Sequence, residues 1–568
     1  MRPPYRLLPA LWAGFALLLI GASAAGQSVA SAVRAPGKSA VASAHPLASE
    51  AGMEVLAKGG NAFDAAVAVS AALAVVEPKG SGLGGGGFYL LHRADGARDV
   101  FLDARETAPA AATRDMFLDQ GGNAVRDRSR RSGLAAGIPG EPAAFEHLAT
   151  QYGKLPLSVS LAPAIRIARE GFPLYPKLRS EIERVREAML ASPDAAQIFL
   201  VDGQVPPDGH LIRQPDLART LELLARDGAQ GFYTGAFAQK LVAGVRELGG
   251  IWSVEDLAGY RVIEREPLVT GYKGLRVITA PPPSSGGLWL ANVFNMLSGY
   301  DLERMDPLTR KHVIVEAMRR AHRDRAEYVG DPAFVQIPVE MLTSPWYAAG
   351  QRASIRFDAA TPSRSLPSTA VDFPRGTQTT HFAVLDAAGN RVSGSITLNG
   401  WFGTGLVARG TGVLLNNEMD DFVARRAAPN QWELVGGGAN LVEPGKRPAS
   451  SMTPTFVESD KGVAILGAPG GSFIPSMVLI STLAWMQGAD ATQIVATPRF
   501  HHQFSPDTVF SEDDAFSAEE RAGMEKLGHA FRPWPMTIGN MQIIAWDYAS
   551  GAVTAASDPR GAGVSIVR

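Results

Sequence analysis

The chain has 568 residues and no cysteine. This absence excludes disulfides, thiol nucleophiles, iron–sulfur clusters and cysteine-bound zinc. Excess charge of one sign is missing too, because 54 Lys and Arg balance 56 Asp and Glu. We find no basic run broad enough to follow a phosphate backbone, so a nucleic-acid partner is not expected. The available chemistry is that of hydroxyls, carboxylates, imidazoles, amines and backbone groups.

Apolar residues make up 46% of the chain and charged residues 19%. Such a composition supplies a sizeable core and excludes disorder as the bulk state. The length allows either two domains or one large layered domain.

Apolar runs are too short to cross a membrane, which takes ~20 residues. Residues 1–6 are basic, residues 7–21 are apolar except for Pro9, and Ala22-Ser23-Ala24 offers a small-x-small cleavage pattern. We therefore expect residues 1–24 to be a signal peptide and the mature protein to be exported, either periplasmic or secreted, without a membrane partner. A membrane anchor is the alternative.

Two motifs that suggest a cofactor or a metal do not fit their structural context. Residues 80–85 match G-x-G-x-x-G, but the nucleotide-binding form follows a strand and opens a helix. Here an apolar helix, expected over 62–76, precedes the glycines and a strand-like stretch follows, which predicts a tight turn. His501 and His502 are adjacent, point to opposite faces of a strand, and have no acid at ligand spacing. We expect no cofactor and no metal.

A boundary is expected in the second half of the chain. The Pro/Ser/Thr/Arg-rich passage 360–378 lacks periodicity and predicts an exposed, flexible connection. Beyond it, short β-like runs alternate with turns. Residues 379–386 and 391–399 are predicted to be strands joined by a three-residue hairpin loop, with Gly389 left-handed. If Asp386 pairs with Asn390, Thr379 lies opposite Thr397.

The return strand carries polar residues on one face, from Arg391 to Asn399, and apolar residues on the other. A polar face that ends in Thr397 and Asn399, beside Thr379, is either a solvated edge or a functional site. The pattern alone favours both equally.

The sequence around this hairpin resembles the γ-glutamyltranspeptidases, and the resemblance extends over nearly the whole mature chain. Gln-Thr-Thr-His-Phe, Thr-Leu-Asn and Asn-Asn-Glu-Met-Asp-Asp-Phe begin at residues 378, 397 and 416. Further blocks match in order at residues 59–66, 83–88, 105–110, 281–287, 448–452, 469–472, 498–502 and 557–560.

This resemblance implies an αββα sandwich of the N-terminal-nucleophile hydrolase type that cuts itself between Gln378 and Thr379. Residues 25–378 would become a large subunit and residues 379–568 a small one, and the two subunits would form one αββα unit and a heterodimer. Thr379 would be the nucleophile. A hydroxyl needs a base, and the freed α-amino group of Thr379, with a reference pKa of ~7.7–8.0, suits that task.

The resemblance also implies roles for other residues. Thr397 would hold the nucleophile, and the backbone N–H groups of Gly470 and Gly471 would form an oxyanion hole. The substrate would be a small γ-glutamyl amide such as glutathione, and the acceptor water, an amino acid or a peptide. Its α-carboxylate would meet Arg105, Ser450 and Ser451, and its α-ammonium Asn399, Glu418 and Asp421. Arg105 and Asp421 should then face each other across a gap that fits one amino-acid head group.

Two departures from the family concern the acceptor side. Trp432 stands where many bacterial members carry Tyr in the loop that covers the site, and it lacks a phenolic O–H. Gly400-Trp401 replaces small hydroxyl or polar residues. Two rival functions are an acylase for another side chain, such as a glutaryl amide, and an unprocessed, non-catalytic periplasmic binding protein. The retained acids argue against the first, and intact Thr379 and Thr397 against the second.

Overall fold

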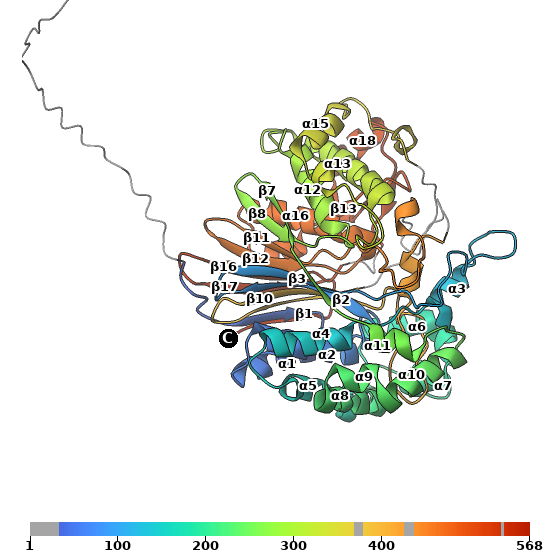
Figure 1. Cartoon of the computed structure of the whole chain (residues 1–568). Coiled ribbons are helices and arrows are strands. Elements are labelled where there is room, and N and C mark those ends of the chain that lie inside the picture. Colours follow the sequence, from blue (N-terminus) through green and yellow to red (C-terminus); the bar gives the residue numbers. More distant parts are fainter. Residues whose placement is uncertain (1–32, 369–378, 425–436, 536–538) are drawn as a thin grey trace, which may run out of the picture.

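The computed structural model describes residues 33–368, 379–424, 437–535 and 539–568. The expected signal peptide, Gln378 and the expected lid residue Trp432 lie outside these ranges. Two antiparallel sheets are stacked face to face and covered by helices on both outer faces (Figure 1). This is the predicted four-layer αββα architecture.

The first sheet has seven strands and the second has six. In spatial order, the first contains β18 (Val564–Val567), β1 (Ala40–Ser43), β9 (Thr380–Leu385), β10 (Arg391–Thr397), β2 (Gly86–Arg93), β3 (Arg98–Ala104) and β6 (Ile263–Arg265). The second contains β17 (Val553–Ser557), β16 (Gln542–Asp547), β12 (Gly462–Gly467), β11 (Thr455–Glu458), β8 (Leu275–Thr279) and β7 (Leu268–Tyr272). Smaller sheets join β13 (Phe500–His501), β14 (Val509–Ser511) and β15 (Phe531–Pro533), and β4 (Phe172–Pro173) with β5 (Leu211–Ile212).

Helices from the first half of the chain lie on the side of the seven-stranded sheet (Figure 1). They are α1 (Pro46–Ala57), α2 (Ala62–Val76), α4 (Glu141–His147), α5 (Leu157–Glu170), α6 (Pro176–Leu190), α7 (Pro193–Phe199), α8 (Pro215–Asp227), α9 (Ala229–Tyr233), α10 (Gly235–Glu247) and α11 (Val254–Gly259). On the other side lie α12 (Gly286–Leu297), α13 (Pro307–Tyr328), α15 (Pro345–Ala353), α16 (Ile474–Met486) and α18 (Ala518–Lys526). Short helices α3 (Arg126–Arg130), α14 (Val339–Leu342) and α17 (Ala491–Ala496) complete the set.

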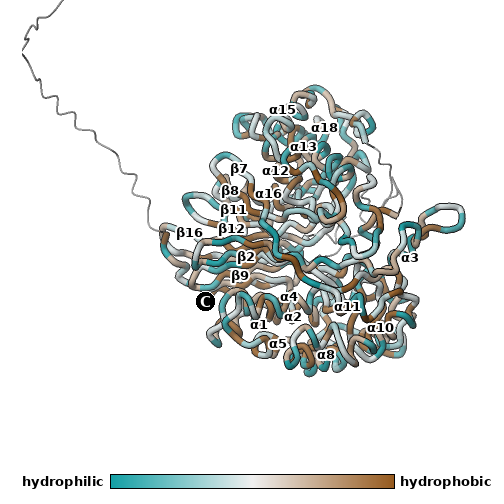
Figure 2. The backbone as a smooth tube through the Cα atoms, in the orientation of Figure 1, coloured by the Kyte–Doolittle hydropathy of each residue, from teal (hydrophilic) through white to brown (hydrophobic). Residues whose placement is uncertain are grey.

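Alternating side chains of the seven-stranded sheet pack into two separate cores. On β2, Tyr89 and Leu91 pack into the core shared with the first helical layer, whereas Phe88 and Leu90 pack toward the second sheet. This alternation is the period of two that a strand imposes. Both faces of the sheet are buried, and Figure 2 shows hydrophobic stretches along its central strands.

Helix α2 occupies the predicted residues, Ala62–Val76. Asn61 and Asp64 form a reciprocal capping box at its start, and every residue of the helix is buried. The glycine-rich residues 80–85 form the turn between α2 and β2, as predicted.

The predicted hairpin register is confirmed. Thr380 pairs with Ile396 and Leu385 with Arg391, and Gly389 has a φ of 91°. The return strand ends at Thr397, however, two residues earlier than expected. Asn399 adopts a left-handed φ of 69°, so it leaves the strand and does not continue the face of Thr397.

The polar face of β10 is neither solvated nor at an edge. Ser393 donates to Leu466 O at 3.1 Å and accepts from Thr455 N at 3.1 Å, and both partners belong to the second sheet. The polar residues of β10 therefore lie between the two sheets, and Thr397 lies at the end of this buried row.

The passage expected to be flexible is anchored over its described part, residues 360–368. A short turn, Ser363–Ser365, is held by Asp507, whose Oδ2 accepts from Ser363 N at 2.7 Å. Arg319 also donates to Ser363 Oγ at 2.7 Å. Fixed polar partners on α13 and after β13 thus replace the secondary structure that the composition lacks; residues 369–378 lie outside the described ranges.

Strands from both sides of Thr379 are mixed in the two sheets. In the first sheet, β1 lies between β18 and β9, which both follow Thr379 in sequence. In the second sheet, β8 from before Thr379 pairs with β11 from after it. Neither half of the chain therefore contains all the strands of either main sheet.

Candidate functional site

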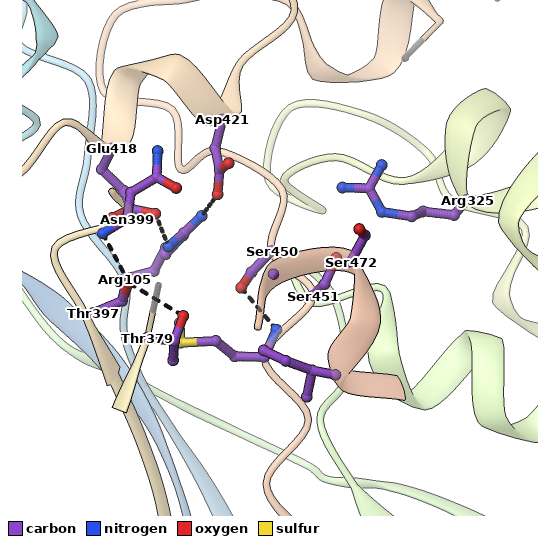
Figure 3. A pocket seen from close by; sticks show the side chains of 13 residues that line it. Arg105, Arg325, Thr379, Thr397, Asn399, Glu418, Asp421, Ser450, Ser451 and Ser472 are labelled. Carbon is purple, nitrogen blue, oxygen red and sulfur yellow. Dashed lines mark hydrogen bonds and ion pairs between the residues drawn. The ribbon is translucent and has the colours of Figure 1, made fainter. Parts of the chain in front are cut away.

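Thr379 and Thr397 lie side by side at the end of the β9–β10 hairpin. Their Oγ1 atoms are 3.4 Å apart, and both residues are buried. Asn399 N donates to Thr397 Oγ1 at 2.8 Å, which orients that hydroxyl and leaves its proton available for donation to Thr379 (Figure 3). The hairpin thus presents a buried hydroxyl with a second hydroxyl beside it.

Arg105, directly after β3, lies among acids. Its Nη1 contacts Glu418, and its Nη2 donates to Asp421 Oδ2 at 2.5 Å (Figure 3). Nε and Nη2 also donate to the carbonyls of Pro448 and Ala449, at 3.2 and 3.1 Å. We expected a gap between Arg105 and Asp421 that fits an amino-acid head group. Instead the two opposite charges attract each other and form an ion pair that closes the gap.

Burial and charge shift the pKa values in this cluster. Burial lowers the pKa of Arg105, but Glu418, Asp421 and Glu106 outweigh it and raise the pKa above its usual range. Burial raises the pKa of Glu418 well above its usual value, against the opposing effect of Arg105. Burial also raises the pKa of Glu106 to about 8, and its carboxylate has no hydrogen-bond partner among the described residues. Three acids therefore share one guanidinium.

Arg105, Glu418 and Asp421 line one pocket together with Thr379 and Thr397. Nine of the residues singled out from the sequence line it: Arg105, Thr379, Thr397, Asn399, Glu418, Asp421, Ser450, Ser451 and Gly471. Gly470 does not line the pocket but directly precedes Gly471. Sequence reasoning missed four lining residues: Arg325, Met452, Ser472 and Ile474.

Gly470 and Gly471 form a turn that leads into α16. Their φ values are 138° and 54°, in the region that favours glycine. The turn is followed by the N-terminus of a thirteen-residue helix, where backbone N–H groups and the helix dipole favour negative charge. The position is suited to an anion that develops on a group bound at Thr379.

The remaining predicted residues are held by backbone contacts. Asn399 Nδ2 donates to Asn417 O at 2.9 Å, so its amide oxygen is the group suited to an ammonium. Ser450 Oγ accepts from Met452 N at 3.1 Å. Trp401 does not line the pocket. It packs against the first helical layer with Arg184 over its ring, at 5.3 Å from the centroid, so the Gly400-Trp401 departure does not alter the pocket wall.

One group of described residues has the composition of a metal site: the potential ligand atoms of His312, Glu316 and His529 lie within 4.8 Å of one another. His312 Nδ1 and His529 Nε2 are 2.8 Å apart, which is a hydrogen bond. Glu316 already pairs with Arg319 and Arg320. Two guanidinium groups beside the carboxylate repel a cation, so the cluster fits a polar network better than a metal. Similarly, His502 contacts Asp507 at 3.2 Å, an acidic partner that the sequence did not reveal.

No helix within the described ranges is both long and apolar enough to span a membrane.

A threonine hydroxyl at the start of a central strand, in an αββα sandwich, places the molecule in the class of N-terminal-nucleophile hydrolases. The protein-family model described as Gamma-glutamyltranspeptidase matches residues 48–567. The chain therefore belongs to that family. The expectation drawn from the sequence motifs is confirmed at this level.

Curated relatives and solved structures agree. The chain is 41% identical over 499 residues to a glutathione hydrolase proenzyme of Pseudomonas sp. (strain A14), covering 86% of each chain. It is 39% identical over 525 residues to that of Escherichia coli (strain K12), covering 92% of this chain and 90% of the relative. A cephalosporin acylase from Bacillus halodurans superposes with a TM-score of 0.82 at 29% identity, over 94% and 96% of the two chains. The Helicobacter pylori γ-glutamyltranspeptidase gives 0.55 at 40% identity, over 57% of this chain and 93% of its own.

Proposed function

We propose that this protein is an exported γ-glutamyl hydrolase and transferase that acts on glutathione and similar γ-glutamyl amides through an acyl-enzyme on Thr379. The observation that carries the proposal is the contact of Thr379 with Thr397 in a pocket that also holds Arg105 and Asp421. One small cavity thereby combines a nucleophile with both charges that an amino-acid head group requires.

Maturation comes first in this scheme. The Thr379 hydroxyl attacks the carbonyl carbon of Gln378, the peptide C–N bond breaks, and water hydrolyses the resulting ester. The products are a large chain ending at Gln378 and a small chain beginning at Thr379, which remain together as a heterodimer. Cleavage frees the Thr379 α-amino group, which then serves as the base for its own hydroxyl.

Catalysis follows the same chemistry. The α-amino group takes the hydroxyl proton while Thr379 Oγ1 bonds to the γ-carbonyl carbon. The oxyanion is stabilised by backbone N–H groups of Gly470 and Gly471. Collapse of the tetrahedral intermediate breaks the amide C–N bond, and the departing amine takes the proton from the α-amino group of Thr379. Water or an acceptor amine then attacks the ester, giving glutamate or a new γ-glutamyl amide.

Recognition of the head group requires the Arg105–Asp421 pair to separate. The α-carboxylate replaces Asp421 on Arg105, with Ser450 and Ser451 as further donors, and the α-ammonium replaces Arg105 on Asp421. Glu418 and Asn399 add acceptors for the ammonium. Because one internal ion pair is exchanged for two substrate pairs, only a ligand with both charges compensates fully. Trp432 would cover this site and weaken acceptor selection for lack of a phenolic O–H.

A second candidate is an acylase for another side chain, favoured by the likeness to a cephalosporin acylase over nearly the whole chain. A glutaryl group lacks the α-ammonium and would offer Asp421 no charged partner from the substrate, which makes it the poorer substrate.

Mass spectrometry and two anilides test the proposal together. Wild-type protein should yield a chain that begins at Thr379 and should cleave a γ-glutamyl anilide much faster than the glutaryl anilide. Transfer to an added dipeptide measures the transferase activity. Protein that stays in one piece, or that prefers the glutaryl anilide, contradicts the proposal.

A further inference from the structure

Arg325 brings a second guanidinium into the pocket. It belongs to α13, a helix that supplies none of the residues expected in the site. Figure 3 shows its side chain directed into the pocket from the side opposite Arg105, with Ser451 and Ser472 between them. The pocket therefore has cationic groups on two separate walls.

The two arginines differ in what they have left to donate. Arg105 uses Nε, Nη1 and Nη2 on two acids and two carbonyls. The buried Nε of Arg325 has no hydrogen-bond partner among the described residues. Burial lowers the pKa of Arg325 to about 10, with an opposing effect of Asp421, so it is charged at neutral pH. A half-buried cation whose buried Nε lacks a hydrogen-bond partner among the described residues favours binding of an anion.

The anion that suits Arg325 is not the donor head group. An amino acid carries its ammonium and carboxylate on one carbon, so both charges bind at one place. Arg105 and Asp421, in direct contact at 2.5 Å, offer such a place. A cation on the opposite wall fits a carboxylate several bonds away, beyond the scissile amide.

We propose that Arg325 is a specificity-determining residue that binds a carboxylate on the leaving group and on the incoming acceptor. The preferred donors are then γ-glutamyl amino acids and γ-glutamyl peptides, and the preferred acceptors are amino acids or peptides with a free carboxylate. Amides of neutral amines are poorer substrates. This inference rests on the proposed γ-glutamyl activity and specifies its substrate class.

A purely electrostatic role for Arg325 is the competing explanation. Glu106, Glu418 and Asp421 outnumber Arg105, and a second cation nearby reduces their repulsion. In that case removal of Arg325 affects every γ-glutamyl substrate alike, because the leaving group is not involved. The two explanations therefore differ in what they predict for one ratio: kcat/KM for a donor with a carboxylate on its leaving group, divided by kcat/KM for the same donor without it.

Two chromogenic donors measure this ratio: γ-glutamyl-4-nitroanilide and γ-glutamyl-3-carboxy-4-nitroanilide, which differ only in a carboxylate on the leaving group. Wild-type enzyme should prefer the carboxylated donor in kcat/KM. Arg325→Gln should lower that preference about tenfold or more, the usual effect of losing a hydrogen bond to a charged group. Arg325→Lys should restore part of it. Arg310→Gln, in the first turn of the same helix and outside the pocket, should leave it unchanged.

The acceptor side gives an independent readout with glycylglycine and glycylglycine amide. Arg325→Gln should reduce transfer to the dipeptide and spare transfer to its amide. Equal losses on both members of either pair overturn the inference while leaving the proposed function intact. So does a wild-type enzyme without preference for the carboxylated donor, whatever the variants do. A wild-type enzyme inactive on both anilides overturns the proposed function, and this inference with it.

Discussion

The hydroxyl of Thr380 donates a 2.6 Å hydrogen bond to Glu77 Oε2, just beyond the C-terminus of α2. Adjacent residues of a strand point to opposite faces, so this contact lies behind the pocket that Thr379 lines. Glu77 is itself paired with Lys79 at 3.2 Å, which also lies 3.4 Å from Glu181. A buried network on the helical side thus fixes the start of β9.

Gly80 packs against this same point, and its replacement should displace the nucleophile. A Cβ at Gly80 would lie 2.5 Å from Thr380 Oγ1, which is too close, and 3.2 Å from Thr379 O, which is a tight contact that requires a small shift. Gly80→Ala should therefore slow both self-cleavage and turnover, by about tenfold or more in kcat/KM. Gel separation of the chains and an anilide assay measure the two effects.

Gly82→Ala is the matched control, because its Cβ would have ordinary contact, 3.4 Å, with Leu398. It should mature and turn over like the wild type. Equal damage from both alanines would show that the turn as a whole, rather than the approach to Thr379, is sensitive.

Replacing the nucleophile should stop maturation. Thr379→Ala removes the only atom that can attack the preceding carbonyl in the proposed scheme, so the protein should remain one chain. Thr379→Ser keeps a hydroxyl and should still divide, more slowly. Intact-mass spectrometry resolves the products, and division of the alanine variant at residue 379 would refute the assignment.

The charge of Asp421 should discriminate between donors. Asp421→Asn keeps the size but removes the partner of the α-ammonium, so kcat/KM for a γ-glutamyl anilide should fall at least about tenfold. The matching glutaryl anilide has no ammonium and should lose far less. Arg105→Ala should lower turnover of both anilides. The α-carboxylate of the γ-glutamyl group and the terminal carboxylate of the glutaryl group lie at the same distance from the scissile amide, so both would bind Arg105. Equal losses for Asp421→Asn on the two anilides would mean that Asp421 only supports the shape of the site.

Acid should destabilise the fold through buried imidazoles. Burial lowers the pKa of His381 from 6.5 to about 3. Below pH 6.5 the unfolded chain therefore binds a proton that the folded chain does not, and stability is lost as the pH falls toward 3. His381→Gln should reduce the loss of unfolding free energy between about pH 7.5 and about pH 5 by roughly 2 kcal/mol. Denaturant titrations at the two pH values measure it.

His210→Gln controls for this effect, because His210 is exposed. It should leave the difference between the two pH values unchanged. A His381→Gln protein with the wild-type pH dependence would show that His381 does not remain neutral in the fold.

Local signals explain which parts of the fold the sequence predicted. The apolar run of α2 and the Asp386–Asn390 hairpin loop are local sequence patterns, so the bounds of the helix and the register of the hairpin were predicted. Helix α16 was not anticipated, because residues 474–482 are all buried and give no amphipathic period.

In the candidate site too, contacts within one local element were predictable from the sequence, and contacts between distant segments were not. The predicted hairpin register placed Thr379 beside Thr397 correctly, because a single hairpin joins them. Arg325 was missed because α13 carries basic residues on several sides, and only the packing of this helix against α12 and α18 selects the one that lines the pocket. The contact of Arg105 with Asp421 depends on segments 316 residues apart, which no local pattern reveals.

The mixing of strands from both sides of Thr379 changes the order of the folding reaction once the chain is cut. A precursor refolds as one molecule, at a rate independent of concentration. Two separated chains must meet before β1 can lie between β18 and β9, so recovery after complete denaturation becomes bimolecular and fails on dilution. In the proposed scheme, the cut that creates the nucleophile therefore also ends the unimolecular refolding of the molecule.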